Sequence, residues 1–255
     1  MRSAIEIKHL IIKAGEIAAH NQGNTLDIQI KEDQSPVTNI DKLLSRYIVE
    51  SLHKFTPNIP VISEEEKIPD LSNISTFWLV DPIDGTKSYI RGEDSYTVNI
   101  GLIDNGVPTY GFIYQPSQKL LHYTDQDLKL VVEMNGKNIG DRVAKKRAKG
   151  CVIAISKRSS SQEMQNFLQD NNASEVISIS SSIKLCLVAD GSVDLYPRFG
   201  ETMEWDIAAG HALVKASGGD VVGLDGKSMK YGKPGLLNKG FLACGPEYLG
   251  TKFVL

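Results

Sequence analysis

Two carboxylates and a hydroxyl make up the stretch of the chain with the clearest chemical potential. Asp81 and Asp84 are followed by Gly85 and Thr86, directly after the apolar residues 77–80, which predict a buried strand. Carboxylates held this close repel each other and raise each other's pKa unless a cation lies between them. Mg²⁺ suits such a pair because it takes oxygen ligands, often carboxylates together with substrate phosphates. A solvated turn after the strand is the alternative interpretation.

The turn itself is predicted from Pro82 and Gly85. We expect the strand to stop at Asp81-Pro82, because proline has no N–H to give to a strand ladder. Pro82 also stiffens the turn, and Gly85 allows a tight backbone conformation. The two carboxylates are therefore expected at the end of a strand rather than within it.

Three further carboxylates are candidates for the same site. Glu64 begins a run of three glutamates after the short apolar strand 59–62, and neighbouring strand ends commonly share one rim of a sheet. Asp206 opens a predicted helix over 206–217 whose first turn is small, and Asp41 lies in the first turn of a helix that Thr38 is expected to cap. A solvated loop for Glu64 and ordinary helix capping for both aspartates are the alternatives.

Composition limits the class of protein. The chain has 255 residues, 41% of them hydrophobic and 23% charged, which predicts a soluble globular protein with one large domain or two small ones. The net charge of −3 does not suggest a nucleic-acid binder. We expect no signal peptide, because charges interrupt the apolar residues at the N-terminus. We also expect no membrane span, because the sequence has no apolar run of about 18 residues. Three scattered cysteines argue against a disulfide framework and a zinc site, and fit a reducing cytosol.

The predicted elements divide the chain at a basic stretch, residues 145–149. Before it we expect helices over about 4–20 and 38–52, a strand over 26–31, and a hairpin with its turn at Asp104-Asn105-Gly106. After it, strands and helices alternate, including a helix over about 182–189 and a strand over 192–196. The basic stretch is interpreted as a solvated linker, with an anion or membrane-surface patch as the alternative.

Three stretches taken together resemble the inositol monophosphatase superfamily. They are Glu-Glu at 64–65, Asp-Pro-Ile-Asp-Gly-Thr at 81–86 and Trp-Asp-Ile-Ala-Ala-Gly at 205–210, and the resemblance covers nearly the whole chain. The superfamily comprises lithium-sensitive, Mg²⁺-dependent phosphomonoesterases. Lys87 and the stretches 35–38, 181–186 and 194–200 are similar to its bacterial 3'(2'),5'-bisphosphate nucleotidases. Those enzymes remove the 3'-phosphate of adenosine 3',5'-bisphosphate (PAP) to give AMP.

The resemblance implies a fold and a metal site. The fold is a mixed α+β and α/β architecture, a layered αβαβα sandwich of the inositol monophosphatase and sugar phosphatase type. An N-terminal α+β domain, 1–149, would supply most metal ligands, and a C-terminal α/β domain, 150–255, would complete the site in the cleft between them. Two or three Mg²⁺ ions would be bound by Glu64, Asp81, Asp84, Asp206 and the backbone carbonyl of Ile83.

It also implies catalytic and substrate-binding residues. Thr86, hydrogen-bonded to Asp41 and assisted by Glu64, would take a proton from a metal-bound water. Lys184 and Arg198, with Ser181, would bind the second phosphate of the substrate; a solvated helix face for Lys184 and an ordinary salt bridge for Arg198 are the alternatives. The full set expected to contact substrate is Glu64, Ile83, Asp84, Gly85, Thr86, Lys87, Ser181, Lys184, Arg198 and Asp206.

The predicted function is hydrolysis of PAP, which would clear the PAP left by sulfate assimilation or sulfotransfer. An inositol-1-phosphatase or a fructose-1,6-bisphosphatase of the same superfamily is the nearest alternative, and a non-catalytic phosphate or metal sensor is the alternative from another class. We expect a small-molecule bisphosphate substrate, no nucleic-acid partner and a cytoplasmic location. The sequence leaves open a monomer or a homodimer, and a peripheral contact with the cytoplasmic face of the inner membrane.

Overall fold

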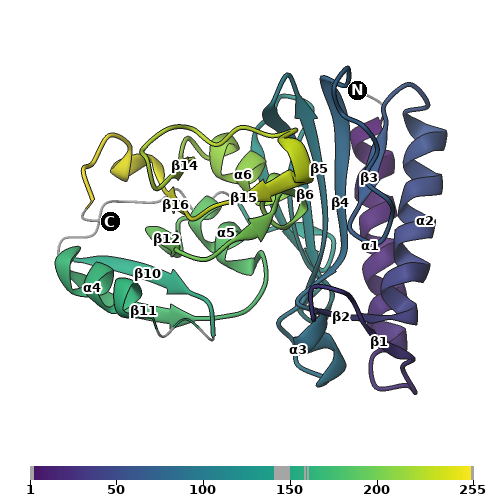
Figure 1. The fold of residues 1–255 in the computed structure, drawn as a ribbon, viewed down its shortest axis with the longest axis horizontal. Coiled ribbons are helices and arrows are strands. Elements are labelled where there is room, and N and C mark those ends of the chain that lie inside the picture. Colours follow the sequence, from purple (N-terminus) through teal and green to yellow (C-terminus); the bar gives the residue numbers. More distant parts are fainter. Residues whose placement is uncertain (1–2, 141–149, 158, 160, 254–255) are drawn as a thin grey trace.

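Five layers of secondary structure form the molecule, seen edge-on in Figure 1. The computed structural model describes residues 3–140, 150–157, 159 and 161–253. The basic stretch 145–149, where the sequence placed the domain boundary, lies outside the described residues. Within the described part of the chain, no helix has both the length and the apolar character needed to span a bilayer.

The first layer is a pair of helices, α1 (Ser3–Asn21) and α2 (Asn39–Phe55). Apolar residues at helical spacing on both helices, including Ile7, Ile11, Leu44 and Ile48, are buried against the neighbouring sheet. Thr38 caps α2 as predicted: its hydroxyl accepts hydrogen bonds from the first turn, and Asp41 accepts one from the Thr38 backbone. The cap fixes where α2 begins, and with it the position of Asp41.

The second layer is a seven-stranded sheet in the order β3-β4-β5-β6-β7-β8-β9. Only β3 and β4 pair in parallel; every other neighbouring pair is antiparallel. The predicted hairpin is present between β5 and β6, and its two turn residues, Asn105 and Gly106, have φ of 50° and 73°. The strands are β3 (Val61–Ser63), β4 (Thr76–Asp84), β5 (Thr97–Asp104), β6 (Val107–Gln115), β7 (Leu120–Thr124), β8 (Leu130–Met134) and β9 (Lys137–Asn138).

The prediction that the strand after residue 77 ends at Asp81-Pro82 is wrong, because β4 continues to Asp84. Asp81 pairs with Asn99 and Asp84 pairs with Thr97, so two residues of β4 face one residue of β5. This bulge contains Pro82, which cannot donate to the ladder and therefore falls at the interruption. The bulge separates the two carboxylates without ending the strand.

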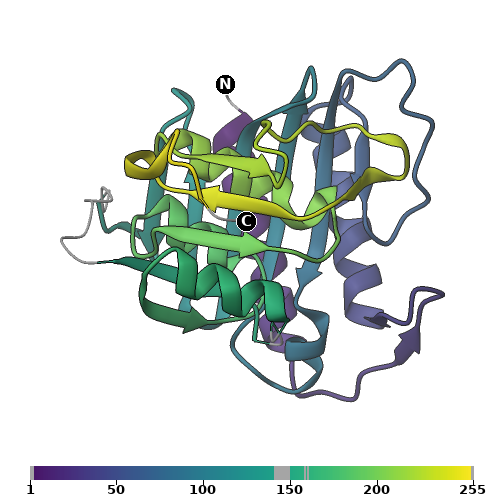
Figure 2. The same cartoon turned by 60° about the vertical axis from the view of Figure 1, so that its left-hand side comes forward.

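Helices α5 (Ile183–Ala189) and α6 (Glu204–Ala216) form the third layer, between the two sheets. A five-stranded sheet in the order β11-β10-β12-β16-β14 is the fourth, and α4 (Gln162–Asp170) covers its outer face (Figure 2). In this sheet β10 is parallel to β11 and β12, whereas β16 is antiparallel to β12 and β14. Its strands are β10 (Cys151–Ile155), β11 (Ala173–Ser178), β12 (Leu195–Arg198), β14 (Asp220–Gly223) and β16 (Phe241–Cys244).

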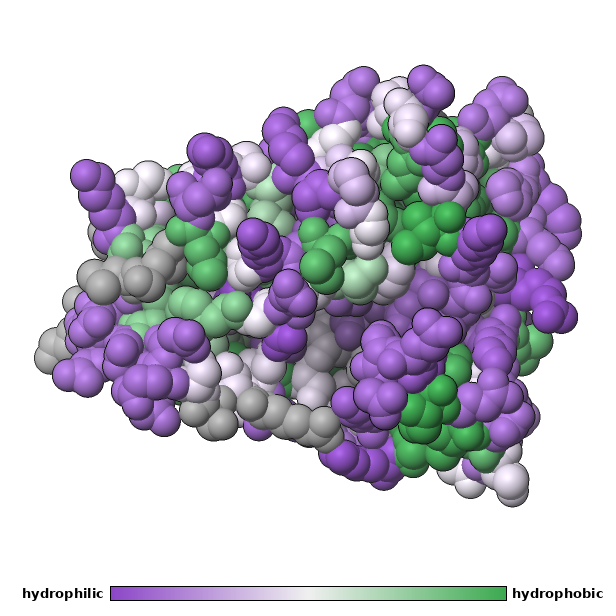
Figure 3. All heavy atoms as spheres, viewed as in Figure 1, coloured by the Kyte–Doolittle hydropathy of each residue, from purple (hydrophilic) through white to green (hydrophobic). Residues whose placement is uncertain are grey.

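The layers confirm the predicted αβαβα architecture, although some boundaries differ. The strand expected over 26–31 is β1 (Ile28–Ile30), the strand expected over 192–196 is β12, and the helix expected from Asp206 begins at Glu204. β1 pairs with β2 (Pro36–Thr38) outside the main sheets, and a hydrophobic patch is visible over it in Figure 3. The remaining elements are α3 (Thr86–Ile90), β13 (Thr202–Met203), β15 (Leu237–Asn238) and the short 3₁₀ segments at Pro116–Gln118, Pro234–Leu236 and Pro246–Tyr248.

Small residues let α6 lie unusually close to the first sheet. A Cβ on Gly111 would come within 2.2 Å of the backbone oxygen of Ala209, and one on Gly101 within 2.8 Å of its backbone nitrogen. On the other side, a Cβ on Gly210 would meet the side chain of Leu185 at 2.3 Å. The small first turn of α6 therefore serves helix packing, and it sets how near Asp206 can come to β4.

The core between the two sheets contains residues from both halves of the chain, for example Leu79 and Ile113 together with Val152 and Leu213. The division into domains 1–149 and 150–255 stays a prediction, since a shared core does not show whether either half folds separately.

Candidate active site

Strand ends bring the predicted carboxylates together. Glu64 directly follows β3, and its backbone N–H donates to the Val80 carbonyl of β4 at 3.1 Å, one residue before Asp81. Asp84 lies beyond the bulge on the same strand. Asp206 approaches from the first turn of α6, where its carboxylate also accepts a hydrogen bond of 2.8 Å from the Met203 backbone. Asp206 therefore caps the start of α6 from its third residue, and its role as a metal ligand stays a prediction.

The carboxylates interact strongly. Burial, and then the charges of Glu64, Asp84 and Asp206, raise the pKa of Asp81 well above its usual value. Burial and the charges of Asp84 and Glu64 do the same for the pKa of Asp206. Asp81 and Asp206 are thus close in space, although 125 residues separate them in the chain. A buried group of like charges is unfavourable unless protons or cations neutralise it.

An oxygen-binding cation fits this site. The Oδ1 atom of Asp81 is buried without a hydrogen-bond partner among the described residues, which is costly unless a cation lies beside it. All the predicted ligands are oxygen donors, as Mg²⁺ prefers. As the side chains stand, no three His, Cys, Asp or Glu side chains in the described ranges enclose a metal position. Asp84 instead accepts a hydrogen bond from the Ser182 backbone, and Glu64 contacts a lysine.

That lysine, Lys31, is a site residue that the sequence reasoning missed. Its Nζ atom lies 2.7 Å from carboxylate oxygens of both Glu64 and Glu65. Burial lowers the pKa of Lys31, but the two glutamates outweigh burial and raise it above its usual range. The alternating residues 26–31 indicate only a strand, so no local signal points from Lys31 to a carboxylate 33 positions away.

Asp41 and Thr86 form the hydrogen bond that the family resemblance implied. The Thr86 hydroxyl lies 3.2 Å from Asp41 Oδ1 and 3.1 Å from the Ile83 carbonyl oxygen. The other oxygen of Asp41 accepts from the backbone and the hydroxyl of Thr38. Burial, and then the charge of Glu64, raise the pKa of Asp41. One carboxylate therefore caps α2 with one oxygen and holds Thr86 with the other.

Gly85 allows the turn that places Thr86. Its φ of 93° is left-handed, and a Cβ there would lie 3.0 Å from the Ser95 carbonyl oxygen. Thr86 then begins α3, directly beyond the β4 bulge. A side chain at position 85 would be strained in conformation and crowded in space.

A network that the sequence did not reveal holds Asp84 against the start of α5. Asp84 Oδ2 accepts from the backbone N–H of Ser182 and from Asn99 Nδ2 at 3.4 Å. The Ser182 hydroxyl lies 2.8 Å from Thr97 Oγ1 and 2.9 Å from Asn99 Oδ1. These contacts join β5 of the first half of the chain to α5 of the second half.

A cavity of about 150 Å³ lies between Asp84 and Asp206, with Lys184 and Arg198 among its lining residues. Lys184 is 3% exposed, so the alternative of a solvated helix face is wrong. Its Nζ atom donates to the carbonyls of Ile179 at 3.1 Å and Ser181 at 2.6 Å. Burial is the main cause that lowers the pKa of Lys184 to about 8, against the opposing charge of Asp84.

Arg198 has hydrogen-bonding capacity to spare. Its guanidinium donates to the Ser156 hydroxyl and the Glu201 carbonyl, each at 3.3 Å, while its buried Nε has no partner among the described residues. It makes no ion pair within the described ranges, so a salt bridge does not account for its position. Ser181, with φ of 60°, lines the cavity, whereas Lys87 lies along a neighbouring groove. The roles of these residues toward substrate stay predictions.

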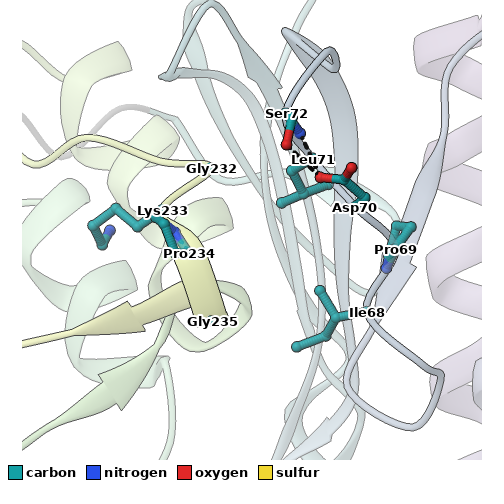
Figure 4. A pocket seen from close by; sticks show the side chains of 9 residues that line it. All are labelled: Ile68, Pro69, Asp70, Leu71, Ser72, Gly232, Lys233, Pro234 and Gly235. Carbon is teal, nitrogen blue, oxygen red and sulfur yellow. Dashed lines mark hydrogen bonds between the residues drawn. The ribbon is translucent and has the colours of Figure 1, made fainter.

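A second cavity, of about 420 Å³, lies apart from the carboxylates. Figure 4 shows residues 68–72 facing residues 232–235 across it, with Ile68 and Leu71 pointing toward the opposite segment. Its charged groups are already paired: Asp70 accepts from Ser72, and Lys233 lies 2.6 Å from the buried Glu204 carboxylate.

The fold and the carboxylate site define a class. The sequence pattern of the inositol monophosphatase family matches residues 2–252, and the chain belongs to this family. Solved structures agree in fold: an IMPase of Thermotoga maritima superimposes with a TM-score of 0.80 at 23% identity, covering 97% of this chain and 94% of that one.

Within the family, the chain is similar to proteins named 3'(2'),5'-bisphosphate nucleotidase CysQ. The protein of that name from Buchnera aphidicola is 35% identical over 229 residues, 88% of this chain and 86% of that protein. The one from Escherichia coli K12 is 38% identical over 220 residues, covering 85% and 88%. The structure of CysQ from Bacteroides thetaiotaomicron superimposes with a TM-score of 0.80 at 32% identity, covering 96% of this chain and 97% of that one.

Proposed function

We propose that the protein is a Mg²⁺-dependent phosphatase that hydrolyses the 3'-phosphate of PAP to give AMP and phosphate. The observation that carries this proposal is the cavity in which the carboxylates Asp84 and Asp206 meet the cations Lys184 and Arg198. The phosphate to be hydrolysed needs carboxylates that hold metal ions, and the second phosphate needs cationic side chains that bind it directly. A bisphosphate therefore requires both kinds of charge side by side. The names of the similar nucleotidases support the same substrate.

The metal site would be formed by Glu64, Asp81, Asp84, Asp206 and the carbonyl of Ile83, holding two or three ions. When bound, Mg²⁺ lowers the pKa of a coordinated water and balances the negative charge of the phosphate. The unpartnered Oδ1 of Asp81 and the mutual repulsion of the carboxylates support this assignment.

Thr86 and Asp41 would handle the proton of the attacking water. The Thr86 hydroxyl donates toward Asp41, so its lone pairs are free to accept a hydrogen from the water. As Thr86 takes that proton, its own hydroxyl proton would pass to Asp41, and the water oxygen attacks phosphorus in line. The bond from phosphorus to the 3'-oxygen breaks, and that oxygen takes a proton from solvent water. Glu64 would assist, and the backbone N–H groups of Gly85 and Thr86 would hold phosphate oxygens.

The test is phosphate release from PAP, inositol 1-phosphate and fructose 1,6-bisphosphate, measured side by side with Mg²⁺ and with EDTA. We expect kcat/KM for PAP to lead by about a hundredfold, or about 2.7 kcal/mol of transition-state preference. Asp84→Asn, which keeps the size of the side chain, should abolish Mg²⁺-dependent release.

Each alternative function has its own outcome in this test. Sugar phosphates hydrolysed as fast as PAP would replace the nucleotidase proposal by an inositol-1-phosphatase or a fructose-1,6-bisphosphatase. Mg²⁺ binding without hydrolysis of any substrate would favour the sensor. The Asp41–Thr86 hydrogen bond argues against the sensor, because a binding module has no use for it.

We also propose that the enzyme acts in the cytoplasm on this small-molecule substrate. The choice between monomer and homodimer, and any peripheral membrane contact, stay predictions.

A further inference from the structure

A second, larger groove adjoins the cavity between Asp84 and Asp206. Its volume is about 600 Å³, and it shares Ser156, Ser181, Lys184 and Arg198 with that cavity. Its other walls come from both halves of the chain: from α3 and the loop after it, and from the end of β10. Figure 3 shows hydrophilic side chains over α3.

The groove is strongly cationic. Among the described residues, five cationic side chains and one carboxylate line it, although the chain as a whole has a net charge of −3. A local excess of positive charge concentrates anions at that place on the surface. The net negative charge already favours solubility, so solubility does not explain this cationic cluster. The cationic residues are Lys87, Arg91, Lys157, Lys184 and Arg198.

The carboxylate in this lining, Glu93, contacts two of these cations. Lys157 Nζ lies 2.8 Å from Glu93 Oε2, and Arg91 Nη1 lies 3.7 Å from Oε1. Lys157 also donates to the Ser95 hydroxyl at 3.3 Å. The side chains of Lys157 and Arg91 remain 45% and 57% exposed, so an anionic ligand can reach both. Exposed ion pairs such as Lys157–Glu93 and Arg91–Glu93 contribute little to the free energy of unfolding. Fold stability therefore does not explain why these three charged side chains lie together.

We propose that Lys157 and Arg91, in addition to Lys184 and Arg198, bind the phosphate of the nucleotide that is not hydrolysed, with Glu93 holding the Lys157 and Arg91 side chains in position. The inference rests on the proposed function and extends it to residues outside the carboxylate site. Lysine supplies a compact charge and arginine a planar fork, which together suit a dianionic phosphate. Lys184 and Arg198 line both cavities, so the cationic lining runs from the groove to the carboxylate site.

The first test compares PAP with adenosine 3'-monophosphate, which has the same base and scissile phosphate but lacks the 5'-phosphate. We expect Lys157→Met and Arg91→Met each to lower the ratio of kcat/KM for PAP over the monophosphate by about tenfold. Lys227→Met removes the same charge from an exposed turn away from the groove and should leave the ratio unchanged. An unchanged ratio in the two groove variants, whether activity is kept or falls equally on both substrates, would overturn the proposal.

A binding measurement separates this inference from the proposed function. AMP carries only the phosphate assigned to the groove, and adenosine carries neither, so calorimetric titration with both needs no hydrolysis. We expect Lys157→Met to weaken AMP binding by about tenfold and to leave adenosine binding unchanged. If the wild-type protein binds AMP through Lys157 but does not hydrolyse PAP, the proposed function fails and the groove assignment stands. If AMP binds equally to both proteins, the groove assignment fails whatever the activity.

Discussion

Thr86→Val tests the assignment of the proton-handling pair, because it removes the hydroxyl at nearly unchanged size. The Thr86 hydroxyl lies 3.2 Å from Asp41 Oδ1, slightly longer than a usual hydrogen bond between two oxygens. Asp41 keeps its two bonds from Thr38 in the variant, so the fold loses only one of three donors to this carboxylate. We expect a loss of about 1.5 kcal/mol of unfolding free energy, or about 3–6 °C in Tm.

The catalytic loss should be much larger than the folding loss. If Thr86 accepts the proton of the attacking water, its removal costs the usual contribution of a general base, about 10²- to 10⁴-fold in kcat. That corresponds to about 3–5 kcal/mol of activation free energy, two to three times the expected effect on stability.

The assay is steady-state phosphate release from PAP at saturating Mg²⁺, with thermal unfolding of the same samples. Thr86→Ser is the matched control: it keeps the hydroxyl, and we expect its kcat to stay within about tenfold of wild type. A Thr86→Val enzyme whose kcat lies within threefold of wild type would refute the role of Thr86. A serine variant as slow as the valine variant would show that the methyl group, not the hydroxyl, matters.

Three further predictions follow from buried groups. Asp81→Asn should raise Tm in EDTA, because burial and neighbouring charges raise the pKa of this carboxyl and make its ionised form destabilising at neutral pH. Mg²⁺ should then stabilise the wild type more than the variant, by about 2.7 kcal/mol at a hundred times its Kd. A variant that melts below wild type in EDTA would contradict this reasoning. Gly111→Ala should cost about 1–3 kcal/mol in urea unfolding because its Cβ would lie 2.2 Å from the Ala209 oxygen, while Gly200→Ala, with no contact under 3.7 Å, should be nearly neutral. Hydrogen bonds to Asp220 outweigh its burial and lower its pKa from 3.8 to about 2. The free energy of unfolding of wild type should therefore exceed that of Asp220→Asn by its full amount above pH 4, and this difference should disappear as the pH falls toward 2. Urea unfolding at stepped pH measures that difference, and one that does not shrink with pH would refute the assignment.

The features that the sequence predicted well depend on residues close together in the chain. The Thr38 cap and the turn at Asn105-Gly106 are set within four residues, and both are present. The cluster of Glu64, Asp81 and Asp84 follows from strand ends that share one rim of a sheet. Their convergence with Asp206 needed the family resemblance, because nothing local in the chain reports a contact over more than a hundred residues.

The features that were missed depend on tertiary structure. For Lys184 the sequence left open a substrate-binding role and a solvated helix face, and only the structure excludes the second, because α5 lies between two sheets and both of its sides are covered. A helix in that position has no polar face to show in its sequence. Lys31, Arg91 and Lys157 belong to loops and strand ends, where the residue type alone does not tell a surface charge from one that points into a site.

The close packing of α6 also has a consequence for the order of events during synthesis. The strands from β4 to β8 pair mostly with their neighbours in sequence, so their contacts form over short loops and the sheet can assemble early. The glycine surface at Gly101 and Gly111 gains its partner only after residues 204–216 have been made. Until then a growing chain displays one uncovered apolar face, where it is most exposed to aggregation and most in need of a chaperone. Because Asp206 arrives on the same helix, the step that covers this face also completes the carboxylate cluster.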